Sequence, residues 1–254
     1  MKKLALVLGM TGAVTFGASA AAIWSETFNY ADGSLTNVSG GLWTSFSGSG
    51  NPAQVSGGKV AGLLAGGVSS QDSERGLGAS YSTGILYAGF DLTLSTAPVG
   101  SAYFAHFKDS TASGFRGRVF VGAPTLAGFR VGLENDVGDN GVSVAFTPDL
   151  NLGETYRVVL GYDTANRTSS LWVNNGTEGS PTLTDATAAT FLAITSFALR
   201  QGGSATATYT GLDVDNLFTA TDFATAYTVP EPSVLAVAGL GALALWAARR
   251  RTRA

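Results

Sequence analysis

The sequence predicts an all-β protein in which two antiparallel sheets pack as a jelly-roll sandwich. Glycine makes up 34 of the 254 residues, well above its usual share of ~7%, and Thr and Ser are abundant while Lys and Glu are scarce. Several stretches alternate apolar and polar residues and are separated by turn residues, as half-buried strands are. Between the two ends of the chain, no long stretch has the spacing of an amphipathic helix. Many short strands without alternating helices favour a sandwich.

The alternating stretches predict the strands in chain order. We expect strands within residues 85–94, 102–107, 115–121, 128–133, 155–162, 169–174, 194–200 and 206–218. Two neighbouring pairs are expected to form hairpins. One joins 115–121 to 128–133 through a turn that contains proline, and the other joins 155–162 to 169–174 across a polar turn. With the remaining segments, the domain is expected to contain ten or more strands.

The N-terminus has the pattern of a secretory signal peptide. Lys2 and Lys3 precede an apolar stretch from Leu4 to about Ala18, and small residues follow up to Ala22. A charged segment, an apolar segment and a small-residue cleavage site are the three parts of such a signal. We expect residues 1–22 to be removed by signal peptidase, after Ala20 or after Ala22. The alternative is a retained N-terminal helix.

The last residues predict a membrane segment. Val229-Pro230-Glu231-Pro232 precedes an uncharged stretch, Ser233 to Ala248, and Arg249, Arg250 and Arg251 follow it. Sixteen helical residues span roughly 24 Å. A membrane span usually needs about 17–25 residues, so this segment is slightly short. The prolines keep the chain extended before the helix, and the arginines are expected to remain cytoplasmic. A precursor that crosses the inner membrane once, with a cytoplasmic C-terminus, is therefore expected.

This arrangement of residues 229–254 resembles the PEP-CTERM sorting tail of exported bacterial proteins. The resemblance implies that Pro230, Glu231 and Pro232 are recognised by an exosortase, a membrane protease that removes the tail. It also implies an exported protein of the cell envelope, cell surface or extracellular matrix. An ordinary C-terminal membrane anchor is the alternative.

Residues 23–228 remain as one domain, which is long enough to bury a sizeable core. Six of the 15 basic residues lie in the two terminal segments, but only one of the 18 acidic residues does, so the domain has 9 basic and 17 acidic residues and a net charge of −8. This charge argues against nucleic acid and anionic polymers as main partners. The chain has no cysteine, which excludes disulfides and thiol chemistry.

Three segments of the domain resemble concanavalin A-like and laminin-G-like jelly rolls. The segment 153–163 with 170–174 is similar to a hairpin of that fold, and 211–218 followed by 221–223 is similar to its final strand. Residues 26–30, ahead of 41–43, are similar to its first strand. A sandwich of unrelated topology is the alternative. The fold alone does not establish function, because lectins, glycanases and adhesion modules share it.

The sequence offers no convincing catalytic carboxylate pair. Glycanases of the resembled fold carry a Glu-x-Asp-x-x-Glu pattern, and a retaining pair must lie about 5–5.5 Å apart. Asp213-x-Asp215 lacks both glutamates. Glu134-Asn135-Asp136 has Asp139 in the last position and lies among turn residues. We therefore expect a non-enzymatic domain.

The single histidine, His106, does not predict a hydrolase or a zinc site. Asp109 is close in sequence, but the chain has no Gly-x-Ser-x-Gly motif. One histidine without cysteine cannot provide the usual zinc ligands. A structural histidine, exposed on a sheet face or hydrogen-bonded, is the favoured interpretation.

Calcium is the one metal that the sequence leaves open. Asp213, Asp215 and Asn216 form one group of oxygen ligands, and a second group of Asp and Asn lies at 136–140 beside glycines. Such hard ligands suit Ca²⁺. The alternative is that these residues form turns by bonding their own backbone.

Two functional hypotheses follow from the sequence. The favoured one is an exported surface or matrix protein without enzymatic activity, with extracellular polysaccharide or a surface protein as its candidate partner. Trp172 is the candidate aromatic residue for sugar binding, with a role in the core as the alternative. The second hypothesis is a divergent glycan-active hydrolase on the same sandwich.

Overall fold

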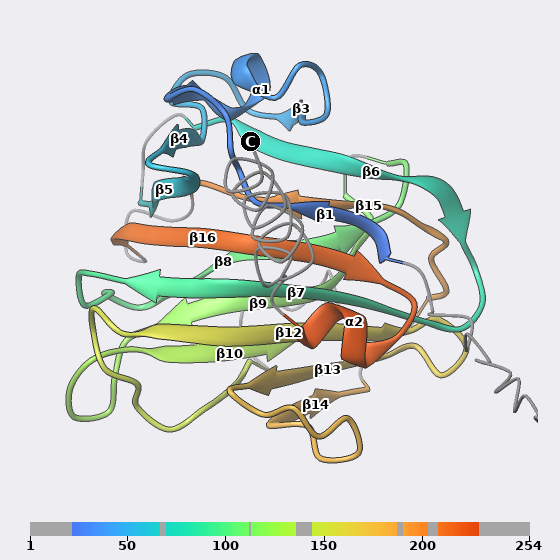
Figure 1. The fold of residues 1–254 in the computed structure, drawn as a ribbon. Coiled ribbons are helices and arrows are strands. Elements are labelled where there is room, and N and C mark those ends of the chain that lie inside the picture. The colour runs from blue at the N-terminus through green and yellow to red at the C-terminus, as the bar shows by residue number, and fades with distance from the viewer. Residues whose placement is uncertain are drawn as a thin grey trace, which may run out of the picture.

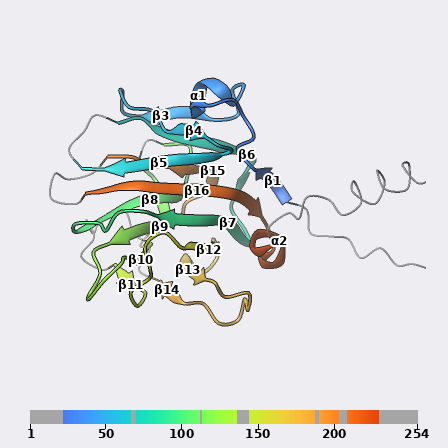
Figure 2. The ribbon, with the colours of Figure 1, turned by 60° about the vertical axis from the view of Figure 1, so that its left-hand side comes forward.

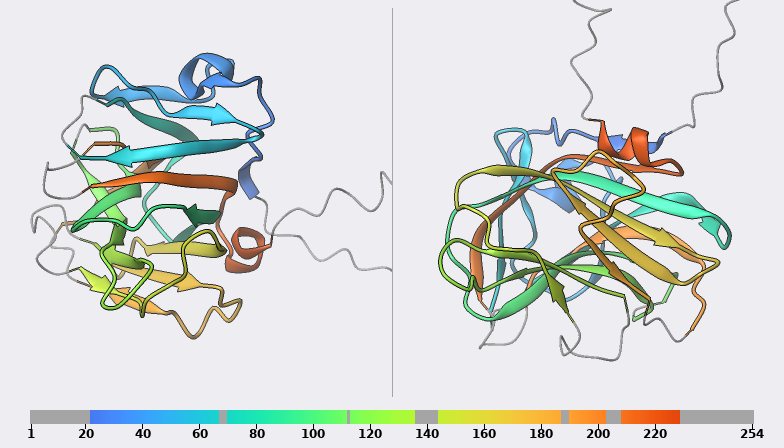
Figure 3. Two further views of the ribbon diagram at one scale, coloured as in Figure 1. Left: turned by 90° about the vertical axis from the view of Figure 1, so that its left-hand side faces the viewer. Right: turned by 90° about the horizontal axis from the view of Figure 1, so that it is seen from below.

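The computed structural model describes residues 22–66, 70–111, 113–135, 144–186, 190–202 and 208–228. In this part of the chain two antiparallel sheets face each other as a sandwich (Figures 1 and 3). The predicted all-β, two-sheet fold is confirmed. None of the described helices is long and apolar enough to cross a membrane. Apart from Ala22, the expected signal peptide and sorting tail lie outside the described residues.

The first sheet, sheet A, contains nine of the described strands. From one edge to the other it runs β14 (Leu183–Asp185), β13 (Thr168–Val173), β12 (Thr155–Asp163), β7 (Ile85–Leu94), β16 (Tyr209–Ala220), β5 (Lys59–Ala65), β4 (Gln54–Ser56) and β2 (Gly33–Ser34). Strand β1 (Ala22–Glu26) pairs with the end of β16. The last long strand of the domain therefore lies in the middle of the sheet, between strands that come much earlier in the chain.

The second sheet, sheet B, contains seven of the described strands. Its order is β11 (Ala145–Phe146), β10 (Arg130–Glu134), β9 (Phe115–Gly122), β8 (Ser101–Lys108), β15 (Ile194–Leu199), β6 (Asp72–Tyr81) and β3 (Thr44–Ser47). Helix α1 (Leu35–Val38) lies beyond β4, and helix α2 (Phe223–Tyr227) packs on the outside of sheet A (Figures 1 and 2).

The predicted strands agree with the structure except at the first one. The hairpins β9–β10 and β12–β13 form as expected. Residues 26–30 were expected as the first strand, but β1 ends at Glu26. The backbone N–H of Phe28 and the hydroxyl of Tyr30 both donate to the Glu26 carboxylate, at 2.8 and 2.7 Å. This carboxylate turns the chain back on itself, and Phe28 adopts a left-handed φ of 50°.

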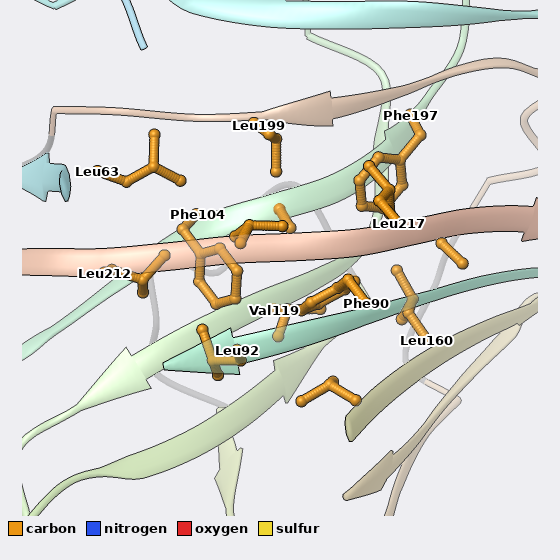
Figure 4. Packing of buried hydrophobic residues seen from close by; sticks show 14 of the residues in the cluster. Leu63, Phe90, Leu92, Phe104, Val119, Leu160, Phe197, Leu199, Leu212 and Leu217 are labelled. Atoms are coloured by element: carbon orange, nitrogen blue, oxygen red, sulfur yellow. The ribbon is translucent and has the colours of Figure 1, made fainter. Parts of the chain in front are cut away.

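The core fills the space between the sheets with apolar side chains from alternate positions of each strand (Figure 4). Phe90 of sheet A meets Phe104 and Phe197 of sheet B, with ring centroids 5.8 and 6.3 Å apart. Side chains alternate across a strand, so the residues between these core positions face outward from the sandwich. The outward faces therefore carry the polar and aromatic residues that are available for function.

Helix α2 is held on the outer face of sheet A by apolar contacts and by Arg157. Phe223 and Ala226 pack against Tyr87, Val159 and Trp172 in a second apolar cluster. The Asp222 side chain caps the helix by accepting from the N–H of Thr225 at 2.9 Å. A side chain at Gly89 would overlap the Ala226 carbonyl, so glycine permits the close approach of helix and sheet.

Arg157 joins four elements at this point. Its guanidinium donates to Asp91 of β7 at 3.2 Å and to the Asn216 carbonyl of β16 at 2.8 Å. It also donates to the carbonyls of Ala226 and Tyr227, at 2.5 and 3.0 Å. The Arg157 side chain is 9% exposed. Burial lowers its pKa, and the negative charge of Asp91 acts in the opposite direction.

The outer face of sheet B contains a buried histidine. His106 is 0% exposed, and the ring of Phe115 lies 4.2 Å from its own. Neither of its nitrogens has a hydrogen-bond partner within the described residues. Burial holds its pKa well below the usual 6.5, and the positive charges of Arg200, Lys108 and Arg118 lower it further. His106 is therefore neutral at pH 7, and the predicted exposed or hydrogen-bonded position is wrong.

We expect Arg157→Met to destabilise the domain by about 3–5 kcal/mol, because the Asp91 carboxylate loses its buried partner. Helix α2 should also become accessible to protease. Chemical denaturation and limited proteolysis measure the two effects. Lys59→Met removes an exposed ion pair on the same face, with Asp213, and should cost about 1 kcal/mol or less. Equal losses in the two variants would contradict the role given to Arg157.

Replacing His106 with Phe should reduce the loss of stability in mild acid. The unfolded chain binds a proton with a pKa near 6.5, whereas folded His106 resists protonation, so His106 weakens the fold as pH falls below about 6.5. The difference between wild type and His106→Phe should grow by up to about 1.4 kcal/mol per pH unit there. Arg200, Lys108 and Arg118 act on this site in both proteins, and Glu74 is paired with Lys108. Parallel stability curves between pH 7 and 5 would contradict the prediction.

Candidate functional site

The candidate binding site lies on the outer face of sheet A, beside helix α2. It is a pocket of about 370 Å³, formed by β7, β12, β13 and the loop that follows β13. Its lining residues are Ile85, Tyr87, Gly161, Asp163, Asn166, Thr168, Ser170, Trp172, Glu178 and Pro181. The volume is within the range of small-molecule sites, about 300–1,000 Å³.

Two aromatic rings form the apolar wall of the pocket. Tyr87 and Trp172 lie 6.1 Å apart between ring centroids, and Phe223 of α2 supports Trp172 from 4.9 Å. A side chain at Gly161 would contact both wall residues, so glycine leaves the floor between them open. Trp172 is 4% exposed. Its neighbours Leu171 and Val173 contact the core between the sheets, whereas Trp172 itself packs on the outer face.

The polar groups of the pocket are oriented by hydrogen bonds. The Tyr87 hydroxyl donates to the Glu178 carboxylate in a short hydrogen bond, and the Trp172 indole N–H donates to the Glu178 carbonyl at 3.1 Å. Asp163 accepts from the backbone N–H groups of Ala165 and Asn166, both at 2.9 Å. Burial raises the pKa of Tyr87, and the Glu178 carboxylate raises it further. Tyr87 therefore stays protonated at neutral pH and keeps its donor role.

A second, polar pocket of about 300 Å³ lies on the same face of sheet A. Its lining residues are Lys59, Asp91, Thr93, Thr155, Asp213 and Asp215. Asp91 and Asp215 lie directly opposite each other on β7 and β16. Burial raises the pKa of Asp215, and the nearby negative charge of Asp91 adds to this effect.

The structure brings two of the three predicted calcium ligands into the polar pocket. Asp213 is engaged by Lys59 Nζ at 2.6 Å and by the N–H of Gly62 at 2.9 Å. Asp215 accepts from the N–H of Asn216, whose side chain donates to Asp91 at 2.8 Å. Within the described ranges, no group of three or more Asp, Glu or His side chains is arranged to hold a metal. The calcium site stays a prediction, and the second group, at 136–140, lies outside those ranges.

The other catalytic candidates do not come together. Glu134 ends β10 and forms an ion pair with Arg118 at 2.8 Å. Asn135 is buried and accepts from the Ser169 hydroxyl at 2.6 Å. Asp109 accepts from the Thr111 N–H and hydroxyl within its own turn. No hydrogen bond joins Asp109 to His106. Asp136, Asp139, the sorting residues Pro230, Glu231 and Pro232, and the arginines at 249–251 lie outside the described residues.

Sequence reasoning missed the partners of Trp172. Tyr87 comes from a strand about 85 positions earlier in the chain, and Phe223 from a helix of five residues that has no long periodic pattern. One signal was available for Tyr87. Tyr87 lies between Leu86 and Ala88 in the predicted strand. Neighbouring side chains of a strand point to opposite faces, so Tyr87 faces outward if Leu86 and Ala88 face the core.

Glu26 shows how an isolated acid in the sequence becomes a structural anchor. Its carboxylate accepts from the Trp43 indole at 3.0 Å and from Arg75 at 2.7 Å, in addition to Phe28 and Tyr30. The residue is 5% exposed. It therefore connects β1, β6 and the segment that follows α1, and has no free position for a reacting substrate.

Comparison with solved structures finds similar chains at low sequence identity. A point mutant of the Emp46p carbohydrate recognition domain is similar over 80% of this chain and 98% of its own, with a TM-score of 0.50 and 10% identity. A sialidase is similar over 77% of this chain, with a TM-score of 0.48 and 16% identity, but this chain spans only 19% of the sialidase. An alginate lyase from Alteromonas sp. 272 has a TM-score of 0.42 and 11% identity, over 72% of this chain and 95% of its own. At 10% identity the likeness to the Emp46p domain bears on the fold alone.

The sequence comparisons concern the C-terminal tail. No curated protein matches this chain. Residues 228–251 match the family described as the PEP-CTERM protein-sorting motif. The resemblance inferred from Pro230, Glu231, Pro232 and the arginines is thereby confirmed, and the chain carries the sorting motif of exported, envelope-associated proteins.

Proposed function

We propose that this protein is an exported, non-enzymatic surface or extracellular-matrix protein that binds carbohydrate in the Tyr87–Trp172 pocket. The observation that carries the proposal is the pocket itself, with two aromatic rings as an apolar wall and oriented polar groups at its rim. A sugar has apolar ring faces and polar hydroxyl edges, and the pocket offers a complement to both. The motif at 228–251 supports delivery to the envelope.

The absence of catalysis is part of the proposal and rests on how the pocket carboxylates are used. Glu178 accepts from Tyr87, and Asp163 accepts from its own loop. Asp213 pairs with Lys59, and Asp91 pairs with Arg157. Carboxylates held in this way stabilise the fold and are poorly placed to exchange protons with a substrate.

The sorting tail extends the proposal to processing and location. We place Ser233–Ala248 across the inner membrane once, with Arg249, Arg250 and Arg251 as the cytoplasmic stop, until an exosortase recognises Pro230, Glu231 and Pro232 and removes the tail. Signal peptidase would remove the N-terminal segment.

A second candidate function, a glycan-active hydrolase, is favoured by one observation. Asp91 and Asp215 form a cross-strand pair on one face, where opposed Cβ atoms lie about 4.5–5.5 Å apart. The raised pKa of Asp215 is the direction that a general acid needs. Against this candidate, Asp91 is tied to Arg157 and Asn216.

Filling the pocket should abolish sugar binding without unfolding the domain. We expect Ser170→Tyr to reduce binding to a panel of soluble neutral glucans, mannans and galactans by at least about tenfold, measured by calorimetry. Thr184→Tyr is the matched control, because Thr184 pairs with Ser170 across β13 and β14 but does not line the pocket. Equal losses in both variants, or no binding of any neutral glycan by wild type, would contradict the proposed site.

Asp215→Asn separates the two candidate functions. We expect no release of reducing ends from the same glycans by wild type and no change in their binding by the variant, which preserves the shape of the side chain. Release by wild type that falls by about 10² or more in Asp215→Asn would replace the binding proposal with the hydrolase.

The processing step can be measured by intact mass. In cells with the exosortase, the exported protein should lack the mass of residues 233–254, and in cells without it the tail should remain. Glu231→Ala should retain the tail in both strains. A tail that stays on wild type in both strains would contradict sorting and leave an ordinary membrane anchor.

A further inference from the structure

The outer face of sheet B carries a cluster of aromatic and positive side chains that the proposed function does not use. The sheet B cluster consists of Tyr103, His106, Phe115, Arg118, Phe120 and Arg200. These residues come from the adjacent strands β8 and β9 and from the position that follows β15. Their neighbours Phe104, Val119 and Leu199 face the core, so the cluster lies on the opposite side of the molecule from the Tyr87–Trp172 pocket.

Tyr103 is the centre of the cluster. Its ring lies 5.6 Å from His106 and 5.5 Å from Phe120. The guanidinium of Arg200 stacks on it at 4.1 Å, and that of Arg118 lies 5.2 Å away. Tyr103 and Arg200 are only partly buried. The face therefore presents an aromatic ring to solvent with a guanidinium held against it.

The charges of this face are not fully paired. Lys108 forms an ion pair with Glu74, and Arg118 with Glu134, both at 2.8 Å. Within the described residues, Arg200 has no carboxylate within 4.0 Å, and it donates to the carbonyl of Gly202 at 3.2 Å. Asp72, another carboxylate of the face, accepts from the backbone N–H of Gln201. Burial raises the pKa of Asp72, and the positive charge of Arg200 acts in the opposite direction.

Arg130, on β10 of the same face, resembles Arg200 in that it bonds a backbone carbonyl and stacks on an aromatic ring. Its Nε donates to the Ala123 carbonyl at 2.8 Å, and its guanidinium stacks on Phe146 at 4.7 Å. In the described part of the chain it has no carboxylate within 4.0 Å, although backbone hydrogen bonds and also its charge lower the pKa of Asp149, and it is partly exposed. Each arginine has five N–H donors, and the described residues accept one from Arg200 and one from Arg130.

Two stacked guanidinium groups beside aromatic rings fit a carboxylate that is attached to an apolar surface. The planar fork of arginine binds a carboxylate through two hydrogen bonds, and an aromatic ring contacts the apolar face of a sugar. Strands β10 and β15 are three strand spacings apart, roughly 14 Å. Arg130 and Arg200 can therefore contact two carboxylates of one polymer chain.

We propose that the outer face of sheet B binds a polysaccharide that carries carboxylate groups, with Arg200 and Arg130 as the recognising residues and Tyr103 as a stacking surface. The net charge of −8 argued against anionic polymers, but exposed charges more than about 8–10 Å away are largely screened in physiological salt. Binding of an acidic polymer to this face therefore depends on the nearby arginines more than on the net charge of the domain.

The test compares polygalacturonate with the same polymer after reduction of its carboxyl groups, using the full chain and calorimetry. Ser170→Tyr, whose filled sheet A pocket cannot take the reduced polymer, a neutral galactan, should bind the acidic polymer and should bind the reduced one at least about tenfold more weakly. Arg200→Gln should weaken binding of the acidic polymer by at least about tenfold. Lys59→Gln removes the same charge from sheet A and should bind like wild type, as should Ser170→Tyr, whose defect would be confined to neutral glycans.

Four results would overturn the proposal. They are the absence of polygalacturonate binding, equal binding of the reduced polymer by Ser170→Tyr, equal losses in Arg200→Gln and Lys59→Gln, and full competition by acetate at the same carboxylate concentration. The last result would indicate a site for small anions only. If Arg200→Gln fails to fold, Arg200→Lys and Arg130→Gln decide, because both should weaken binding if the forked donors recognise carboxylates.

Discussion

The arrangement of sheet A depends on one buried cation, Arg157. It neutralises Asp91 and satisfies carbonyl groups from β16 and α2, so one side chain connects four elements. A buried guanidinium is tolerated only when its donors are satisfied. Because α2 precedes the sorting motif directly, this interaction also holds the folded domain together up to the residue where the motif begins, Thr228.

The two outer faces of the sandwich differ in chemistry because different elements cover them. Helix α2 packs on sheet A and supports Trp172 from one side, which creates a pocket with an aromatic wall. On sheet B, arginines stack on the aromatic rings, and Tyr103 remains partly exposed. The core between the two sheets is built mainly of apolar side chains. The candidate binding residues therefore occupy outward positions of strands whose inward positions pack in the core.

Local patterns predicted the strands well and the site poorly, for a physical reason. The alternation of residues 85–94 reports which side chains share a face, and β7 has these bounds. Residues 27–30 were misassigned because a carboxylate that accepts four hydrogen bonds ended the strand at Glu26, and no local pattern reports that. His106 was expected to be exposed or hydrogen-bonded, yet neighbouring strands bury it among rings.

The fold class and the sorting signal of this protein follow from its sequence alone. Alternation with a period of two, frequent glycine and the absence of long helices are local properties, and the sorting motif is a contiguous segment that matches at 228–251. Only the tertiary structure decided which side chains meet. Asp213 pairs with Lys59 across 154 positions of the chain, and Tyr87 meets Trp172 across two strand pairings. Antiparallel sheets join distant segments by backbone hydrogen bonds that any sequence can form, so the register, and with it the site, arises from packing of the whole domain.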